Sequence, residues 1–216
     1  MHDPFAEPTD TRQAILGAAY RALCEHGYAD ITITRIGEEF DKSPSLVYHH
    51  YDGKDDLLLD LLEFLLDGFE ESVSAGAFEL SPRERIDAYV AATTDPDGLD
   101  TDHAPDGQFL TAMVELRAQA ANDDAYRDHF DRSDRVFHAF LERSVREAGA
   151  ESSPGDREAP PTDPIEPAEA AATLQTLAVG GKFRWATTTD REWVDRSRAG
   201  VQRYLETALP RIDPVE

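Results

Sequence analysis

The side chains best suited to chemistry lie on one face of a short predicted helix, residues 44–51. At 100° per residue that face holds Pro44, Ser45, Tyr48 and His49. It contains no acidic residue, although the chain has 44 Asp and Glu among its 216 residues. Small polar and aromatic groups without negative charge can approach the base edges of DNA. The alternative is a solvent-exposed helix that happens to lack acid.

Lysines flank this face on both sides. Lys42 and Lys54 stand against one acid, Asp52, so residues 42–54 carry a net charge of +1 in a chain of formal net charge −23. A helix that enters the major groove end-on takes base contacts from its N-terminal residues and phosphate contacts from its flanks. The segment therefore predicts a nucleic-acid contact.

Two earlier helices must position that third one. Residues 11–26 place apolar side chains at helical spacing, and Gly27 can end this helix in a left-handed conformation. Thr32 is predicted to cap a second helix that runs to Phe40, and Ser43 to cap the third. Three short helices in this order predict a helix-turn-helix unit.

The third helix should pack by its other face. Val47, His50 and Tyr51 are predicted to point inward, with Leu46 at the edge. The turn signal Asp52-Gly53 should stop the helix.

Downstream, the apolar periodicity predicts six more helices and no convincing strand. The fold is therefore predicted to be all-α, with a three-helix helix-turn-helix domain over residues 1–56 and a six-helix ligand-binding and dimerisation domain over residues 57–216. A proline-rich stretch without periodicity, about 150–166, is predicted to be a mobile loop. The six helices are expected at about 54 to the mid-70s, 82–93 (capped by Ser81), 107–121, 123–149, 167–188 and 191–209.

Overall charge gives DNA binding no support. Residues 1–56 carry 11 acidic and 5 basic residues, and residues 57–216 carry 33 and 16, so neither region is basic. The usual electrostatic footprint of a nucleic-acid-binding protein is missing. An acid-rich chain with only three lysines is typical of proteins from salt-in halophiles. We therefore expect a halophile protein whose DNA contact depends on the motif.

Several other classes of site are not predicted. No stretch approaches the ~20 apolar residues of a membrane helix, and no signal peptide is recognisable, so we expect a cytoplasmic protein that has no contact with a membrane. The lone Cys24 predicts a small core residue. His49 and His50 point about 100° apart on a helix, which argues against a shared metal ion. We expect no catalytic residues, no metal site and no cofactor.

The motif resembles the N-terminal domain of the TetR family over about 48 residues, from Thr11 to Leu58. The resemblance rests on Gly27-Tyr28, a Thr-rich start to the second helix, Ser-Pro-Ser-Leu-Val-Tyr-His-His-Tyr in the third, and the Lys-Asp-Asp-Leu-Leu that follows. The sequence departs from the family pattern at Asp41-Lys42, Gly37 and Leu46, which puts some phosphate hydrogen bonds in doubt.

The resemblance implies a homodimeric transcriptional regulator. Such a protein is expected to repress from a palindromic operator in double-stranded DNA until a small-molecule effector releases it, with recognition helices about 34–36 Å apart. Tyr48 and Lys54 match phosphate contacts, and Pro44, Ser45 and His49 occupy the base-reading face. The full set assigned to DNA is Thr32, Thr34, Lys42, Ser43, Pro44, Ser45, Tyr48, His49 and Lys54.

The segment from Phe109 to Gly149 is loosely similar to regulators of the betaine-regulator type. In these proteins the helical body holds an effector pocket, and the last two helices pair across a two-fold axis. The residues expected at the pocket and at the dimer interface could alternatively be ordinary core residues. The pocket is expected to involve Phe69, Phe109, Met113, Phe137, Leu177 and Trp185, and the dimer interface Leu174, Leu177, Gly181, Val194, Val201 and Leu205.

Two other functions stay open from the sequence. One is a helical ligand-binding protein whose DNA-binding head has decayed, which the acidic N-terminal region and Leu46 motivate. The other is a helical-bundle metalloenzyme. Operator footprinting distinguishes a regulator from a ligand-binding protein with a decayed head. Metal analysis of the purified protein distinguishes a regulator from a metalloenzyme.

Overall fold

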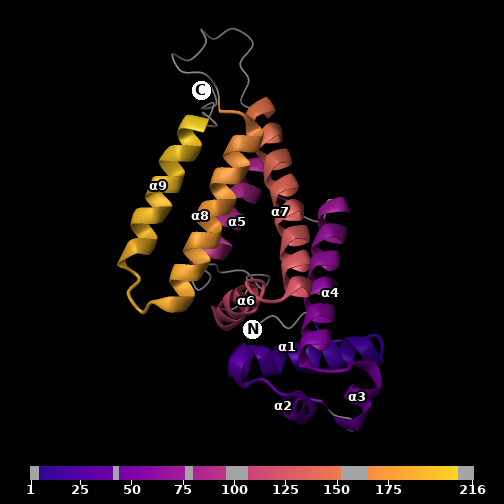
Figure 1. Cartoon of the computed structure of the whole chain (residues 1–216). Helices are drawn as coiled ribbons and strands as arrows, with labels where there is room; N and C mark the ends of the chain where they lie inside the picture. The colour runs from indigo at the N-terminus through magenta and orange to yellow at the C-terminus, as the bar shows by residue number, and fades with distance from the viewer. Residues whose placement is uncertain (1–4, 41–43, 76–79, 96–106, 152–164, 209–216) are drawn as a thin grey trace, which may run out of the picture. The chain divides into compact units, whose positions relative to one another are not determined.

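The computed structural model describes residues 5–40, 44–75, 80–95, 107–151 and 165–208 (Figure 1). In these ranges the chain is helical and has no strand, so the predicted all-α fold is confirmed. The predicted loop at 150–166 and the turn at 41–43 fall largely outside the described residues. The elements are α1 (Thr11–Asp30), α2 (Ile33–Glu38), a 3-10 turn η1 (Pro44–Leu46), α3 (Val47–His50), α4 (Lys54–Ser74), α5 (Pro82–Thr94), α6 (Gly107–Gln119), α7 (Asp124–Glu151), α8 (Pro167–Thr187) and α9 (Glu192–Ala208).

The chain divides into two compact units. The first unit comprises residues 1–75 and 100–133, and the second unit comprises residues 76–99 and 134–216. Helix α7 contributes residues to both. The first unit therefore includes α6 and the start of α7, which the sequence analysis assigns to the C-terminal region.

Helix α1 is the centre of the first unit and packs against α2, α4 and α6 (Figure 1). The N-terminal segment joins this core through Phe5, which is 4% exposed and whose ring lies 5.1 Å from that of Phe64. A Cβ placed on Gly17 would come within 2.6 Å of the Phe5 Cβ, so this close approach requires glycine. No motif in the sequence indicates this role for Phe5.

Local end signals of the helices are confirmed at Thr32 and Ser81, and in part at Gly27. Gly27 has a positive φ of +69°, as predicted, but its ψ of 171° is not left-handed helical, and the predicted helix end at Gly27 is a kink after which α1 continues to Asp30. The Thr32 hydroxyl caps α2 by accepting from the Arg35 N–H at 3.2 Å. Ser81 caps α5 in a full capping box.

The second unit packs α5 against α8 and α9. Thr94 at the end of α5 meets α8 at Gly181, where an added Cβ would lie 2.6 Å from the Thr94 Cγ2. Arg85 on α5 pairs with Glu147 on α7 at 2.7 Å. A smaller aromatic cluster, Trp185, Trp193 and Val194, joins α8 to α9.

Candidate nucleic-acid interface

The third helix presents the predicted face to solvent. Ser45, Tyr48 and His49 are exposed, and Tyr48 reaches 62%. Val47 and Tyr51 point the other way and are buried in the core of the first unit. The exposed face thus combines a hydroxyl, a phenol and an imidazole without an acid, a set able to hydrogen-bond base edges and phosphates.

The predicted inward orientation of His50 is wrong. His50 is exposed, beside the buried Tyr51. The segment is not one continuous α-helix: Pro44–Leu46 forms a 3-10 turn and only Val47–His50 is α-helical. The projection at 100° per residue fails here because α3 is a single turn and Tyr51 leaves it with an extended backbone (φ −138°, ψ 138°), so the buried Tyr51 does not fix the direction of His50.

Five further residues were predicted to contact DNA, and the structure describes only some of them. Thr32 and Thr34 are exposed at the start of α2. Lys42 and Ser43 lie outside the described residues, and Pro44 is described only as the first residue of the 3-10 turn.

Lys54 is engaged within the protein. Its Nζ donates to the Tyr28 carbonyl oxygen at 3.0 Å and lies 4.2 Å from the centroid of the Tyr28 ring. The lysine therefore fixes the end of α1 to the start of α4. A phosphate contact by Lys54 has to share the ammonium group with this carbonyl.

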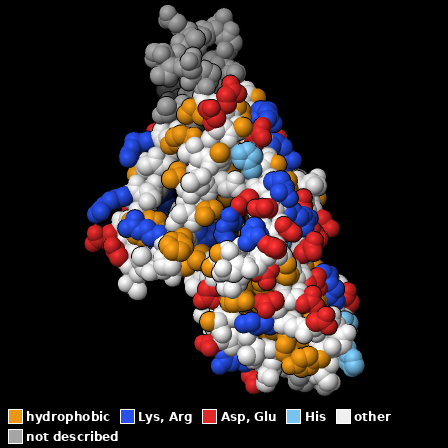
Figure 2. Space-filling view, viewed as in Figure 1, with side chains coloured by type: hydrophobic (Ala, Val, Ile, Leu, Met, Phe, Trp, Pro, Cys, Tyr) orange, Lys and Arg blue, Asp and Glu red, His pale blue; other side chains and the backbone are white. Residues whose placement is uncertain are grey.

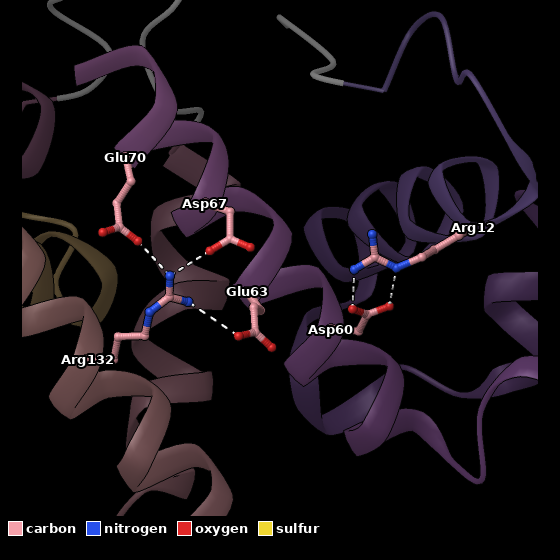
Figure 3. Close-up of polar contacts among 6 residues, drawn as sticks. All are labelled: Arg12, Asp60, Glu63, Asp67, Glu70 and Arg132. Atoms are coloured by element: carbon pink, nitrogen blue, oxygen red, sulfur yellow. Dashed lines mark hydrogen bonds and ion pairs between the residues drawn. The ribbon is translucent and has the colours of Figure 1, made fainter. Parts of the chain in front are cut away.

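One carboxylate ties three helices of the first unit together. Asp60 on α4 accepts from the Nε of Arg12 on α1 at 2.9 Å and from a second nitrogen of the same guanidinium (Figure 3). It also accepts from the Tyr51 hydroxyl, directly after α3, at 2.6 Å. Burial opposes the charge of Asp60, but the hydrogen bonds from Arg12 and Tyr51 outweigh it and lower the pKa of this carboxyl.

A second polar joint surrounds the kink at Gly27. The Tyr28 N–H donates to Glu115 on α6 at 2.5 Å. The hydroxyls of Tyr28 and Tyr126 both donate to the same oxygen of Asp55, at 2.9 and 3.0 Å. Burial and the Asp55 carboxylate raise the pKa of Tyr28 to about 12, so the phenol keeps its proton at neutral pH.

Acidic side chains are spread over much of the face shown in Figure 2. Glu63, Asp67 and Glu70 of α4 all pair with Arg132 of α7, at 3.3, 2.6 and 2.6 Å (Figure 3). Hydrophobic and histidine side chains gather at the α3 end of the first unit in the same view. The segment that forms η1 and α3, residues 44–50, itself contains no acidic residue, unlike the chain as a whole.

The predicted effector residues are divided between the two units. Phe109 and Met113 pack on the core of the first unit. Phe69 is also a residue of the first unit. In the second unit, Phe137 contacts Tyr89, Leu177 is 44% exposed, and Trp185 lies in the tryptophan cluster.

Most of the predicted dimer residues face the interior of the second unit. Leu177 is the exposed member of the set, and Phe183, six residues further along α8, is 59% exposed. The residues buried within the chain itself are Leu174, Gly181, Val194, Val201 and Leu205.

The described part of the chain has neither a metal-binding cluster nor a membrane-spanning helix. No group of three His, Cys, Asp or Glu side chains there is arranged to hold a metal ion. None of the helices described is both long and apolar enough to cross a membrane.

The N-terminal region is similar to a known protein family. Residues 15–61 match the family model of the bacterial regulatory proteins, tetR family. The N-terminal region is therefore similar to the N-terminal domain of that family. The match spans α1 to the middle of α4 and so includes α3, Lys54 and Asp60.

The wider TetR similarity extends beyond this domain. The chain is 27% identical over 143 residues to the HTH-type transcriptional repressor AcnR of Corynebacterium glutamicum, covering 64% of this chain and 68% of AcnR. It is 37% identical over 82 residues to the HTH-type transcriptional regulator BetI of Brucella anthropi, 37% of this chain and 42% of BetI. The match thus spans about two fifths of BetI.

A solved structure covers nearly the whole chain. The crystal structure of a TetR transcription regulator from Haloarcula marismortui superposes with a TM-score of 0.69 at 28% sequence identity. It covers 89% of this chain and 95% of its own. The helical region after the N-terminal domain therefore also has the architecture of a TetR regulator.

Proposed function

We propose that this protein is a one-component transcriptional repressor that binds a palindromic operator as a homodimer and leaves it when a small molecule binds. The observation that carries the proposal is the exposed, acid-free face of α3, held in place by the Tyr51–Asp60 hydrogen bond. Similarity to the transcriptional repressor AcnR supports repression as the sign of regulation. A protein of this kind acts in the cytoplasm.

Base reading is assigned to Ser45, His49 and Pro44, and backbone contacts to Tyr48 and the start of α2. The exposed face has no arginine or lysine, so specificity must come from shape fit, neutral hydrogen bonds and bridging water. Lys42 and Lys54 supply the positive charge at its edges.

Dimerisation is assigned to the exposed side of α8. Leu177, Gly180 and Phe183 are exposed along this helix, and a Cβ added at Gly180 would meet nothing within 4 Å. Small and apolar side chains on one side let a second helix approach closely. The buried residues of the predicted interface support this surface from inside the second unit.

The structure bears on the alternative of a decayed DNA-binding head. Leu46, which motivated that alternative, packs against the core of the first unit. It therefore stabilises the three-helix arrangement rather than interrupting it. The metalloenzyme alternative has no ligand group to rest on among the described residues, and metal analysis of the purified protein tests it directly.

Retention of DNA in a gel shift tests the regulator proposal. The probe is a fragment carrying the gene's own promoter, and the control is a scrambled fragment of equal length and composition. We expect preferential retention of the promoter, both at low salt and at molar salt. Equal retention of the two fragments under all salt conditions contradicts the proposal.

We further propose that the acidic surface is an adaptation to high salt. The formal net charge of −23 is repulsive at low ionic strength, and the Debye length falls to about 3 Å at 1 M salt. Thermal stability should therefore rise between 0.1 and 2 M KCl. A melting temperature that is independent of salt, or that falls with it, contradicts this adaptation.

A further inference from the structure

One arginine of the second unit has hydrogen-bond donors buried without acceptors. Arg83 lies in the first turn of α5, and its Nη1 and Nη2 are both buried with no partner. Its Nε faces the two carboxylate oxygens of Asp87, one turn further on, each at 3.3 Å. The other such atom among the described residues, Trp193 Nε1, belongs to the separate tryptophan cluster.

This arrangement is unfavourable as it stands. The Arg83 side chain is 14% exposed, yet neither Nη atom reaches solvent. Buried donors normally have a protein or water partner, and an exception calls for an explanation such as a missing ligand. Neighbouring arginines do have partners: Arg85 pairs with Glu147, and Arg198 with Asp95. Among the described residues of the second unit, Arg83 is the arginine whose side-chain nitrogens are buried without a partner.

The position of Arg83 is on the side of α5 that meets α8. Spacings of seven and eleven residues place Val90 and Thr94 on the same face as Arg83, and Thr94 packs against Gly181 of α8. The buried side chains of α8 are apolar and mostly small, so they provide no acceptor for the guanidinium. They are Ala170, Ala171, Leu174, Ala178, Gly181 and Trp185.

We propose that Arg83 anchors the carboxylate of a small organic acid bound within the second unit. Asp87 occupies the Nε edge of the guanidinium, which leaves the Nη1–Nη2 edge for the two oxygens of a carboxylate. The apolar surroundings on α5 and α8 suit an aliphatic or aromatic body. The inference names the chemical class of the effector and rests in that respect on the proposed function.

Asp87 also sets the charge of the preferred ligand. Because it already offsets the charge of Arg83, one added carboxylate leaves a local charge of −1, whereas a dicarboxylate would place a further charge near Asp87 with no partner. The site therefore selects monocarboxylates over dicarboxylates of similar length.

Thermal unfolding of the full chain with defined acids tests this site. The probes are butyrate, hexanoate, octanoate and benzoate at constant ionic strength, each compared with its uncharged amide, and adipate is the dicarboxylate. We expect at least one monocarboxylate to raise the melting temperature with concentration, while its amide does not and adipate does so less. The only two tryptophans, Trp185 and Trp193, lie in this unit and give an independent fluorescence reading.

Variants separate ligand binding from a structural role. Arg83→Met should lose the acid-dependent rise, with an apparent affinity roughly tenfold or more weaker. Without acid it should be as stable as the wild type, because buried unsatisfied donors are removed and the 38% exposed Asp87 can turn to water. Arg146→Met, at a 61% exposed arginine of α7, is the matched control and should keep the response.

Three outcomes overturn the inference: no monocarboxylate raises the melting temperature of the wild type, the rise persists in Arg83→Met, or Arg83→Met is destabilised without acid. The promoter gel shift is independent of these. Promoter retention without acid binding supports the regulator proposal and contradicts the carboxylate site at Arg83. Acid binding at Arg83 without promoter retention supports the carboxylate site and contradicts the regulator proposal.

Discussion

The hydroxyl of Tyr51, directly after α3, donates to the carboxylate of Asp60 on α4 at 2.6 Å. The same carboxylate holds Arg12 of α1, so the orientation of α3 is linked to α4 through a side chain rather than through the connecting turn alone. Any rotation of α4 that moves Asp60 must stretch this hydrogen bond or carry α3 with it.

Loss of this carboxylate should weaken both folding and DNA binding. Asp60→Asn should lower the free energy of unfolding by about 1–3 kcal/mol at pH 7, because Arg12 and Tyr51 lose the charge and one of the two acceptor oxygens that they share, and the new amide NH2 faces their donors. The pKa of Asp60 is lowered in the native state, so its contribution is present above the unfolded value of about 3.9 and is lost as pH falls through the native pKa. The variant should therefore lose less stability than the wild type in acid, as measured by denaturant titration.

Tyr51→Phe isolates the link to α3. It removes the 2.6 Å hydrogen bond but leaves the Arg12–Asp60 pair intact. We expect a stability loss of about 1 kcal/mol and a clear loss of promoter affinity at constant salt. Wild-type promoter affinity in Tyr51→Phe would mean that the hydrogen bond does not position α3.

His49 should determine base preference. Its side chain is exposed on α3 and is not part of the core. His49→Ala should change the ranking of operator variants at one base position, with about 1–3 kcal/mol of lost discrimination. His50→Ala, at the exposed neighbour on the other flank, is the control. A uniform loss of affinity for all sequences would make His49 a backbone contact instead.

Gly27 should tolerate no side chain. Its φ is +69°, and an added Cβ would lie 2.8 Å from the Glu115 Oε2 that accepts from the Tyr28 N–H. Gly27→Ala should lower the free energy of unfolding by more than about 1 kcal/mol. Gly68→Ala, in the middle of α4 with nothing within 4 Å, should instead raise it by about 0.5–1 kcal/mol. Thermal melts of the pair check the contrast, and equal effects would argue against the strained kink.

His129 should make stability depend on pH near neutrality. Burial and the Arg132 charge lower the pKa of His129 below its usual value of about 6.5, partly offset by Asp67. The unfolded chain therefore takes up the proton first as pH falls, and the native state loses stability below about pH 6.5 until the native pKa is passed. His129→Gln should show a smaller loss than the wild type between pH 7.5 and 5.5. His49→Gln, at an exposed position, should follow the wild type.

Local features of this chain could be predicted from sequence, and long-range ones could not. The Thr32 and Ser81 caps and the positive φ at Gly27 depend on residues within four positions. The Arg12–Asp60 pair spans 48 residues and the Tyr28–Glu115 hydrogen bond 87, and in a chain with 44 acids no pattern selects the right partner. His50 was misplaced because α3 is only one turn long and the chain becomes extended at Tyr51, which the spacing of the sequence does not reveal.

Charges placed on the exposed side of α8 should abolish the proposed dimer. Leu177 and Phe183 are 44% and 59% exposed. In a symmetric interface, Leu177→Glu with Phe183→Glu would bring like charges together, at a cost of several kcal/mol. Light scattering after gel filtration should then give a mass near the 24.0 kDa of a single chain, compared with twice that value for the wild type.

The control for that variant keeps the added charge and changes only its place. Ala121→Glu with Ala125→Glu adds two acids at exposed positions of the first unit and should leave the mass unchanged. Promoter binding links the two assays: because an operator with two half-sites requires two recognition helices, the α8 variant should lose high-affinity retention while its melting temperature stays near the wild-type value. A dimer that survives both charges would place the pairing surface elsewhere and would leave these exposed apolar groups on α8 without an assigned partner.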